Sequence, residues 1–455
     1  MKAGFAKVKI TPDFPAHLGG AGSGIKRTFQ SVMDDIYARV LVIESSGKKV
    51  CFVSLDVTIV TEEYAEKIRD YAEKAGFSRD AVMVHALQNH SAPSLGHFML
   101  DPDFPELPDE FEYIRGGEKK TYQFILEKTC EAIKIANESI KPVLVGAQSA
   151  VYDGISFNRR AVLKNGKVKM PWFFSHSQYP LGQTDIKYIE GPVDPEIGVL
   201  CFRTPEMKIH SGILHFTCHP VNVFATAQNA ISSDWPGAWI NEIEGFFDAG
   251  CLVVNGCCGN INPWPAFTPD FWPDHRKMGR RLADISKEII PRIVFSDTDV
   301  LEYRSKKIEI PFRIEPEIIK KAKNFLEKNP LPIRRKDSSE VDSQWFGAAS
   351  IMSVEYARKR GNLLYEIQVF RIGDFAIVGF PGEPFVEGQL EIKVHSPAKY
   401  TFFAHATNQY VGYIPTEDAL KRGGHEAKFC YWSKLVPDAL GTIVRTTLSI
   451  LEELF

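Results

Sequence analysis

The stretch ARVLVIESSGKKVCFVSLD, residues 38–56, decides the fold class. Its two runs at 38–44 and 50–55 are apolar and β-branched, a composition typical of strands in a buried sheet. Thr61 then precedes a helical pattern that Gly76 ends, and residues 81–87 form the next apolar run. Strands that alternate with a helix predict an α/β or, more loosely, a mixed α+β fold, with a sheet core covered by helices.

The remaining chain continues this mixture without an internal repeat or a low-complexity tract. Polar turn residues separate the apolar segments, and residues 373–374 are expected at the tip of a hairpin. We expect helices near 121–136, 235–247, 275–290 and 439–454, and strands near 143–147, 197–202, 209–219, 251–254, 364–370 and 375–380.

One catalytic domain is expected to span residues 1–455. The only plausible linker is the segment 329–343, which is rich in charge, proline and serine. It is either a surface excursion or part of an inserted lobe at about residues 300–365.

Composition excludes several classes of protein. The 455 residues are 44% hydrophobic and 24% charged, which indicates a folded chain and not a disordered one. The 54 basic and 57 acidic residues give a net charge of −3, so we expect no nucleic-acid partner. No apolar run reaches the length of about 18 residues that a membrane helix needs, so we expect no membrane partner.

The cellular setting and the partner follow from the cysteines and the first residues. The eight cysteines are dispersed, and the start MKAGFAKVKITPDF lacks the apolar core of a signal peptide. We therefore expect a cytoplasmic protein whose partner is a small-molecule substrate. The oligomeric state is left open.

Polar side chains follow the ends of several expected strands. Function in such folds gathers in these loops, because a rigid sheet can direct side chains to a common point. The residues in these positions are Asp56, Gln88, Asn89, His90, His219, Asn260, Asn262 and Glu383.

Five segments resemble, in order and spacing, the successive motifs of neutral ceramidases and their bacterial relatives. The opening VKITPDFP…GGAGSG is also similar, and the resemblance covers roughly residues 5–430. It implies a neutral-ceramidase-like catalytic domain with a mixed sheet core, a zinc site and an amide-bond hydrolase. The five segments are NHSAP (89–93), CHPVNVF…ISSDWPG (218–237), GCCGNINP (256–263), RIGDFAIVGFPGE (371–383) and NQYVGYIPT (408–416).

The resemblance also implies roles for individual residues. His219, Glu383 and Tyr413 match metal ligands of the family, and Gln88 stands where a further histidine ligand would be. Arg159 matches an arginine that contacts the reacting group. His90 matches a histidine beside the substrate, and His425 falls where the family often carries a tyrosine.

Three departures from the family bear on chemistry. The carboxamide of Gln88 is a harder and weaker zinc donor than imidazole. We therefore expect a metal that is bound more weakly, is of another kind such as Mn²⁺, or is held partly through His90. Asn262 replaces the proposed nucleophilic serine, so an acyl-enzyme cannot form there. The resemblance ends before the family's C-terminal β-sandwich, so we expect neither a counterpart of that domain nor a membrane lipid substrate.

The residues together favour a metal-dependent hydrolase. A divalent cation held by His219, Glu383 and Tyr413 would activate a bound water for attack on a carbonyl of a small polar substrate. His90 or His425 would move protons, while Arg159 and Asn262 would stabilise the oxyanion.

The bond cleaved is either an amide or the C–C bond of a cyclic diketone, such as one derived from inositol. One alternative is ceramide or N-acyl amide hydrolysis, for which the aromatic residues within 264–272 would supply an apolar groove. The other is a catalytically inactive carbohydrate-binding protein, which the replacements Gln88 and Asn262 favour.

Other conspicuous residues have structural explanations. His85 and His215 lie within strand patterns, and Tyr410 is interpreted as a packed aromatic. Cys257 and Cys258 are interpreted as small packing residues. Asp56 and Asp234 either orient histidines or form turns. The glycines at 19, 20, 22 and 24 lack the Lys-Ser/Thr of a phosphate-binding loop.

Overall fold

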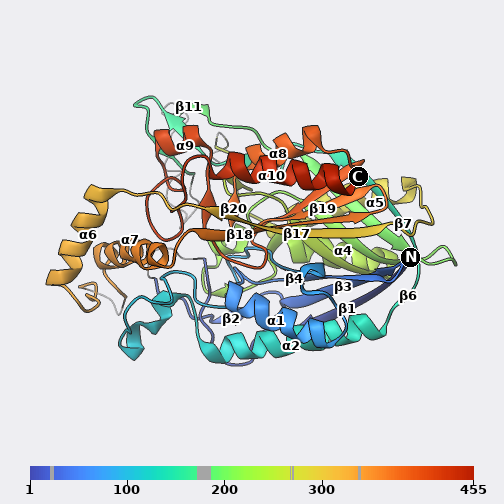
Figure 1. Ribbon diagram of the computed structural model, residues 1–455, viewed down its shortest axis with the longest axis horizontal. Coiled ribbons are helices and arrows are strands. Elements are labelled where there is room, and N and C mark those ends of the chain that lie inside the picture. Colours follow the sequence, from blue (N-terminus) through green and yellow to red (C-terminus); the bar gives the residue numbers. More distant parts are fainter. Residues whose placement is uncertain (21–24, 172–185, 267, 269–270, 337–339) are drawn as a thin grey trace.

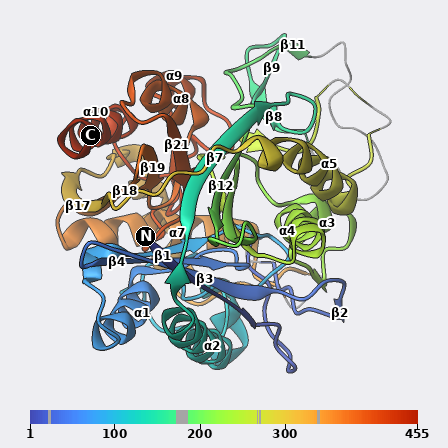
Figure 2. The ribbon, with the colours of Figure 1, turned by 90° about the vertical axis from the view of Figure 1, so that its right-hand side faces the viewer.

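Mixed β-sheets form the centre of the molecule, and helices cover their outer faces (Figure 1). The computed structural model describes residues 1–20, 25–171, 186–266, 268, 271–336 and 340–455. Figure 2 shows α1 and α2 below the sheets, α8 to α10 above them, and α4 and α5 on a third side. The predicted mixed α+β core covered by helices is confirmed.

The first sheet has the strand order β5-β4-β3-β1-β6. All its neighbours are antiparallel except β4 and β5, which run parallel because α1 carries the chain from one to the next. The bounds are β1 Lys2–Lys9, β3 Tyr37–Ser45, β4 Lys48–Leu55, α1 Glu62–Lys74, β5 Val82–Ala86, α2 Lys119–Glu138 and β6 Lys141–Pro142.

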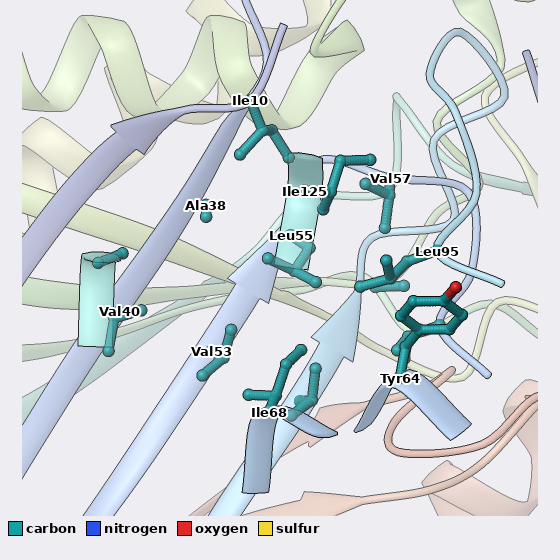
Figure 3. Packing of buried hydrophobic residues seen from close by; sticks show 14 of the residues in the cluster. Ile10, Ala38, Val40, Val53, Leu55, Val57, Tyr64, Ile68, Leu95 and Ile125 are labelled. Atoms are coloured by element: carbon teal, nitrogen blue, oxygen red, sulfur yellow. The ribbon is translucent and has the colours of Figure 1, made fainter. Parts of the chain in front are cut away.

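An apolar cluster holds α1 and α2 against this sheet. Val53 and Leu55 of β4 lie in it with Ile68 of α1 and Ile125 of α2, and all four are buried (Figure 3). Burial of a large aliphatic side chain contributes about 1.5–3 kcal/mol. The alternating apolar side chains of β4 and the helically spaced apolar side chains of α1 therefore pack in one core.

Two further four-stranded sheets repeat the topology of residues 37–86. In each of the three, an antiparallel pair is followed by a helix and then by a strand parallel to the second strand of the pair. The sequence shows no repeat, so this threefold ββαβ unit exists only in the structure. Its later copies comprise β12 Glu196–Arg203, β13 Ile209–Phe216, α4 Asp234–Phe247 and β15 Gly250–Asn255, then β18 Leu363–Ile372, β19 Phe375–Gly379, α8 Val386–His395 and β21 Tyr400–Ala404.

Side chains from all three sheets share one core. Phe52 of β4 packs edge to face on Phe370 of β18, with ring centroids 4.8 Å apart. Ile213 and Leu252 of the second sheet lie in the same buried cluster. The sheets are therefore fixed relative to one another by packed side chains.

A helical pair lies between β17 Leu301–Ile310 and β18, at one end of the molecule (Figure 1). It consists of α6 Pro316–Lys328 and α7 Ser343–Lys359. Since β17 pairs with β18 along its whole length, the expected lobe at 300–365 begins and ends in a core sheet. The division into one domain with an inserted lobe remains a prediction.

The remaining elements are short or peripheral, and no helix in the described ranges is long and apolar enough to cross a membrane. They are β2 Ser31–Val32, β7 Leu144–Val151, β9 Ala161–Leu163, β10 Val168–Lys169, β11 Ile186–Ile189, α3 Asn222–Thr226, β14 Ala230–Ile231, α5 His275–Ile289, α9 Glu417–Arg422 and α10 Ala439–Leu454.

Truncation of Ile68 tests the contact between α1 and the first sheet. The side chain is 0% exposed, so Ile68→Ala leaves a cavity and should lower the free energy of unfolding by about 2–5 kcal/mol. The matched change Ile314→Ala, at a residue that is 58% exposed, should alter it by less than about 0.5 kcal/mol. Urea denaturation followed by circular dichroism measures both. Equal losses would contradict the assigned packing.

Candidate active site

A cavity of about 490 Å³ has seven of the eight predicted site residues in its wall. The eighth, His219, is fully buried behind Glu383. Apolar side chains, including Phe98, Phe224 and Trp264, complete the wall. A mixed polar and apolar cavity of this size is typical of a small-molecule site. The seven residues are Gln88, His90, Arg159, Asn262, Glu383, Tyr413 and His425.

His219 and Glu383 meet across two different sheets. His219 Nε2 lies 3.3 Å from Glu383 Oε2, and neither atom has a hydrogen-bond partner. His219 Nδ1 lies 3.1 Å from the Ile261 carbonyl, to which it donates its proton. Burial holds the pKa of the His219 imidazole well below its ordinary value. The neutral ring therefore presents a bare lone pair on Nε2 to a carboxylate oxygen.

This pair of atoms fits a metal ion. Two ligands about 2.0–2.2 Å from a tetrahedral ion stand roughly 3.4 Å apart. Metal-bound histidines also usually donate their other ring proton to a carbonyl or carboxylate, as His219 does to Ile261. Within the described ranges, no group of three or more His, Cys, Asp and Glu could hold a metal. Further protein ligands in that part of the chain would therefore be amide or phenol oxygens.

Short strands and a glycine position Glu383. β20 Glu383–Pro384 runs parallel to β22 Tyr413–Ile414, and Glu383 lies opposite Tyr413 in the register. Gly382 has φ +71°, and a Cβ on it would come within 2.5 Å of the Gly412 oxygen, so glycine is required there. Both expected oxygen-bearing residues thus reach the cavity from adjacent backbones.

Tyr410 does more than pack. Its hydroxyl donates to Glu383 Oε1 at 3.1 Å, which leaves only Oε2 free. Its ring also packs edge to face on Phe98, with centroids 5.3 Å apart. The interpretation of Tyr410 as a packed aromatic missed the contact with Glu383, because the spacing of 27 residues between the two gives no local signal.

Gln88 lies just beyond β5 in a left-handed backbone conformation, with φ +62°. Such a conformation costs a non-glycine residue roughly 1–3 kcal/mol and is often found at functional sites. Its Oε1 atom lies 2.9 Å from Nε2 of His405, which follows β21. His405 was not predicted as a site residue.

His90 lies beside His219 and Phe224, with ring centroids 5.7 and 5.3 Å away respectively. Burial lowers the pKa of its imidazole well below the ordinary value, so the ring is neutral. The His90 carbonyl accepts from Arg27, which also donates to the carbonyls of Gly19 and Gln228. Arg27, which the sequence did not single out, thus holds three loops of the cavity wall together.

Arg159 connects the cavity to a buried carboxylate. It donates to Glu426 Oε1 at 2.7 Å, to Asn262 Oδ1 at 3.2 Å and to the Gly259 carbonyl at 2.7 Å. The pairing of β8 Phe157–Asn158 with β16 Ile261–Asn262 places Arg159 beside Asn262. Because Arg159 occupies the Asn262 oxygen, the amide nitrogen of Asn262 is the group left for a ligand.

Tyr413 and His425 lie side by side in the cavity wall, next to Arg159. The rings of Tyr413 and His425 meet edge to face with centroids 5.6 Å apart, and the Arg159 guanidinium lies 5.4 Å from the Tyr413 ring centroid. Burial raises the pKa of the Tyr413 phenol well above its ordinary value, and Glu383 adds to the rise. His425 is the solvent-accessible member of the pair.

Neither of the expected structural histidines is among the described residues that line the cavity, whereas Cys258 lies beside Gln88 and His405. His85 Nδ1 donates to the His405 carbonyl at 2.6 Å and its Nε2 accepts from the Asn255 amide, so its ring is fully paired. His215 stacks on Phe402. Cys257 and Cys258 are both buried.

The two aspartates have local partners. Asp56 pairs with Arg39 at 2.6 Å, and Asp234 accepts from the backbone amides of Val223 and Trp235 at the start of α4. Gly22, Gly24 and part of the aromatic segment 264–272 lie outside the described residues.

Comparison with known proteins gives the class of fold. No protein-family model and no curated protein matches the chain. The crystal structure of neutral ceramidase from Pseudomonas aeruginosa superposes with a TM-score of 0.73 and 18% identity, covering 99% of this chain and 74% of that one. A ceramidase complexed with C2 gives 0.71 and 18%, covering 99% and 75%. The chain therefore has the neutral-ceramidase fold, as the sequence resemblance implied.

Glu426 forms buried ion pairs with Arg159 and Arg160, and these predict that the stability of the fold depends on pH. Burial alone would raise the pKa of Glu426, but Arg159, His425 and Arg160 together hold it at about 2, below its ordinary 4.5. A lowered pKa stabilises the fold above about pH 4.5, and the contribution is lost as the pH falls towards 2. Glu426→Gln should therefore cost on the order of 3 kcal/mol at pH 7.

Urea denaturation at pH 7, 5 and 3.5 measures this cost, which should shrink at the lowest pH. The matched change Glu453→Gln, at a half-exposed residue of α10, should cost less than about 0.5 kcal/mol at every pH. A cost at Glu426 that does not vary with pH would contradict the assigned charge state.

Proposed function

We propose that this protein is a metal-dependent hydrolase that adds water to the carbonyl of a small substrate, most directly an amide. One observation carries the proposal: His219 Nε2 and Glu383 Oε2 face each other at 3.3 Å, both buried and both without a hydrogen bond. Two acceptors in this arrangement repel unless a cation lies between them. The neutral-ceramidase fold supports the choice of an amide bond.

The proposed ligands are His219, Glu383, Tyr413 and Gln88. A bound divalent ion would supply Lewis acidity and a more acidic water at this point. With a single imidazole among the proposed donors, this set suits Mn²⁺ as well as Zn²⁺. Tyr410 would keep Glu383 oriented through its hydrogen bond to Oε1.

Arg159 and Asn262 are proposed to stabilise the oxyanion. Arg159 is fixed by Glu426 and by the Gly259 carbonyl, so its guanidinium needs no reorganisation when the substrate acquires negative charge. The Asn262 amide nitrogen adds a neutral donor from the same wall. Neither side chain can form an acyl-enzyme, which favours direct attack by water.

His90 and His425 are proposed to move protons on opposite sides of the substrate. His90, neutral and close to His219, is suited to accept a proton from the attacking water. His425, accessible to solvent in the cavity wall, is suited to exchange a proton with the leaving group.

A second candidate reaction is cleavage of the C–C bond of a cyclic β-diketone. The polar part of the cavity wall contains Arg159 and Asn262, and no serine is among its described lining residues, which favours such an oxygen-rich substrate. In this reaction the leaving group is an enolate, and the same donors would stabilise it. Ceramide itself would draw on the apolar half of the wall, around Phe98, Phe224 and Trp264.

A substrate panel with defined metals tests the proposal. Protein freed of metal with a chelator and then loaded with Mn²⁺ or Zn²⁺ should hydrolyse short N-acyl amides, cyclic β-diketones or N-acyl sphingosines. Glu383→Gln and His219→Ala should each lower kcat/KM by more than about 100-fold, because loss of an inner ligand exceeds the effect of losing an outer partner. The matched control His215→Phe, at a buried histidine outside the cavity, should keep activity.

The other results separate the alternatives. Full activity in the chelated protein would overturn the metal dependence. Tight sugar binding without turnover of any substrate would favour the inactive binding protein.

A further inference from the structure

One of the two polar atoms of the Gln88 carboxamide contacts His405, and the other faces the cavity. Gln88 Oε1 lies 2.9 Å from His405 Nε2, and both side chains are almost fully buried. The second polar atom of the carboxamide has no hydrogen-bond partner among the described residues, and Gln88 forms part of the cavity wall. Which atom of the amide faces the cavity therefore decides whether this wall offers an oxygen or an NH₂ group.

Hydrogen bonds to the backbone define the proton on His405. His405 Nδ1 lies 2.9 Å from the Asn255 carbonyl, which can only accept, so Nδ1 carries the proton. A neutral imidazole with its proton on Nδ1 has a bare acceptor at Nε2. No carboxylate lies within hydrogen-bond distance of the His405 ring in the described part of the chain.

Further hydrogen bonds hold the His405 backbone in place against Asn255 and His85. The Asn255 carbonyl also accepts from the His405 backbone amide, and the His405 carbonyl accepts from His85 Nδ1. The Asn255 side chain is held by Leu87, the residue before Gln88, and by Cys218. These bonds tie the ends of β5, β15 and β21 into one rigid unit.

An amide oxygen placed against a bare Nε2 would bring two acceptors together at 2.9 Å. The Cys258 sulfur lies 3.7 Å from His405 Nε2 and 3.8 Å from Gln88 Oε1, but a thiol is a weak donor and its single proton can serve only one of these two acceptors. Rotation of the Gln88 carboxamide by 180° removes the repulsion, because the NH₂ group then donates to Nε2.

We propose that His405 is a positioning residue that turns the Gln88 carboxamide so that its oxygen faces the cavity that Glu383 also lines. The left-handed backbone at Gln88 (φ +62°) restricts the side chain further. The inference rests on the proposed function in one respect: the oriented oxygen would serve as a ligand for the bound metal. At position 88 this chain thus has an amide oxygen where the family resemblance implies an imidazole ligand. The buried imidazole of His405 sets the direction of that oxygen.

Nitrogen NMR on protein labelled with ¹⁵N-histidine tests the orientation without any metal or substrate. His405 should show a protonated Nδ1 and an unprotonated Nε2 across pH 6–8, assigned by comparison with His405→Gln. A protonated Nε2 would mean that His405 donates to the Gln88 oxygen, and would overturn the inference whatever the activity of the protein.

Metal titration tests the consequence. His405→Met removes the imidazole acceptor and leaves only weakly accepting sulfur atoms near the Gln88 amide, so the Kd for Mn²⁺ measured by calorimetry should rise by about 10–100-fold. His405→Gln keeps an acceptor near the position of Nε2 and should recover most of this loss. His215→Phe removes a buried imidazole that does not touch Gln88 and should leave the Kd unchanged.

Three outcomes are separable. Unchanged Mn²⁺ affinity in a folded His405→Met protein would overturn the positioning role. Loss of affinity in His405→Met with rescue in His405→Gln would support it. A protonated Nδ1 in a wild-type protein that binds neither Mn²⁺ nor Zn²⁺ would refute the proposed function and the ligand role of Gln88, while the assigned tautomer stands.

Discussion

Two buried atoms, His219 Nε2 and Glu383 Oε2, are held 3.3 Å apart with no hydrogen bond to either of them. Each group is held by a hydrogen bond at its other polar atom. The imidazole donates to the Ile261 carbonyl, and the carboxylate accepts from the Tyr410 hydroxyl. Burying an unpaired polar atom costs free energy, and two facing acceptors add repulsion. A fold keeps such an arrangement when it serves binding, and a cation is the ligand that turns the repulsion into attraction.

The threefold ββαβ unit explains how distant residues reach this point. In each copy the parallel strands end at the same edge of their sheet, and the shared core around Phe52 and Phe370 fixes the three edges relative to one another. The first copy delivers Gln88, the second His219 and the third Glu383. A rigid scaffold of this kind can hold ligands at defined distances without help from the ion.

Much of the scaffold could be predicted from the sequence, because apolar periodicity marks strands such as 50–55 and helices such as 439–454 directly. The strand-end rule and the ceramidase-like motifs also picked out seven of the residues that line the cavity. The contacts that orient them could not be predicted. His405 contacts Gln88 although the two are 317 residues apart in the sequence, and no periodicity or turn pattern predicts such a contact. The threefold unit was equally hidden, since its copies share topology and no residue pattern.

Anomalous diffraction from crystals grown with Mn²⁺ tests the central claim most directly. Data collected on both sides of the manganese absorption edge should give one strong difference peak within about 2.0–2.3 Å of both His219 Nε2 and Glu383 Oε2. A fully occupied Mn²⁺ elsewhere in the molecule, with no peak between these two atoms, would contradict the account.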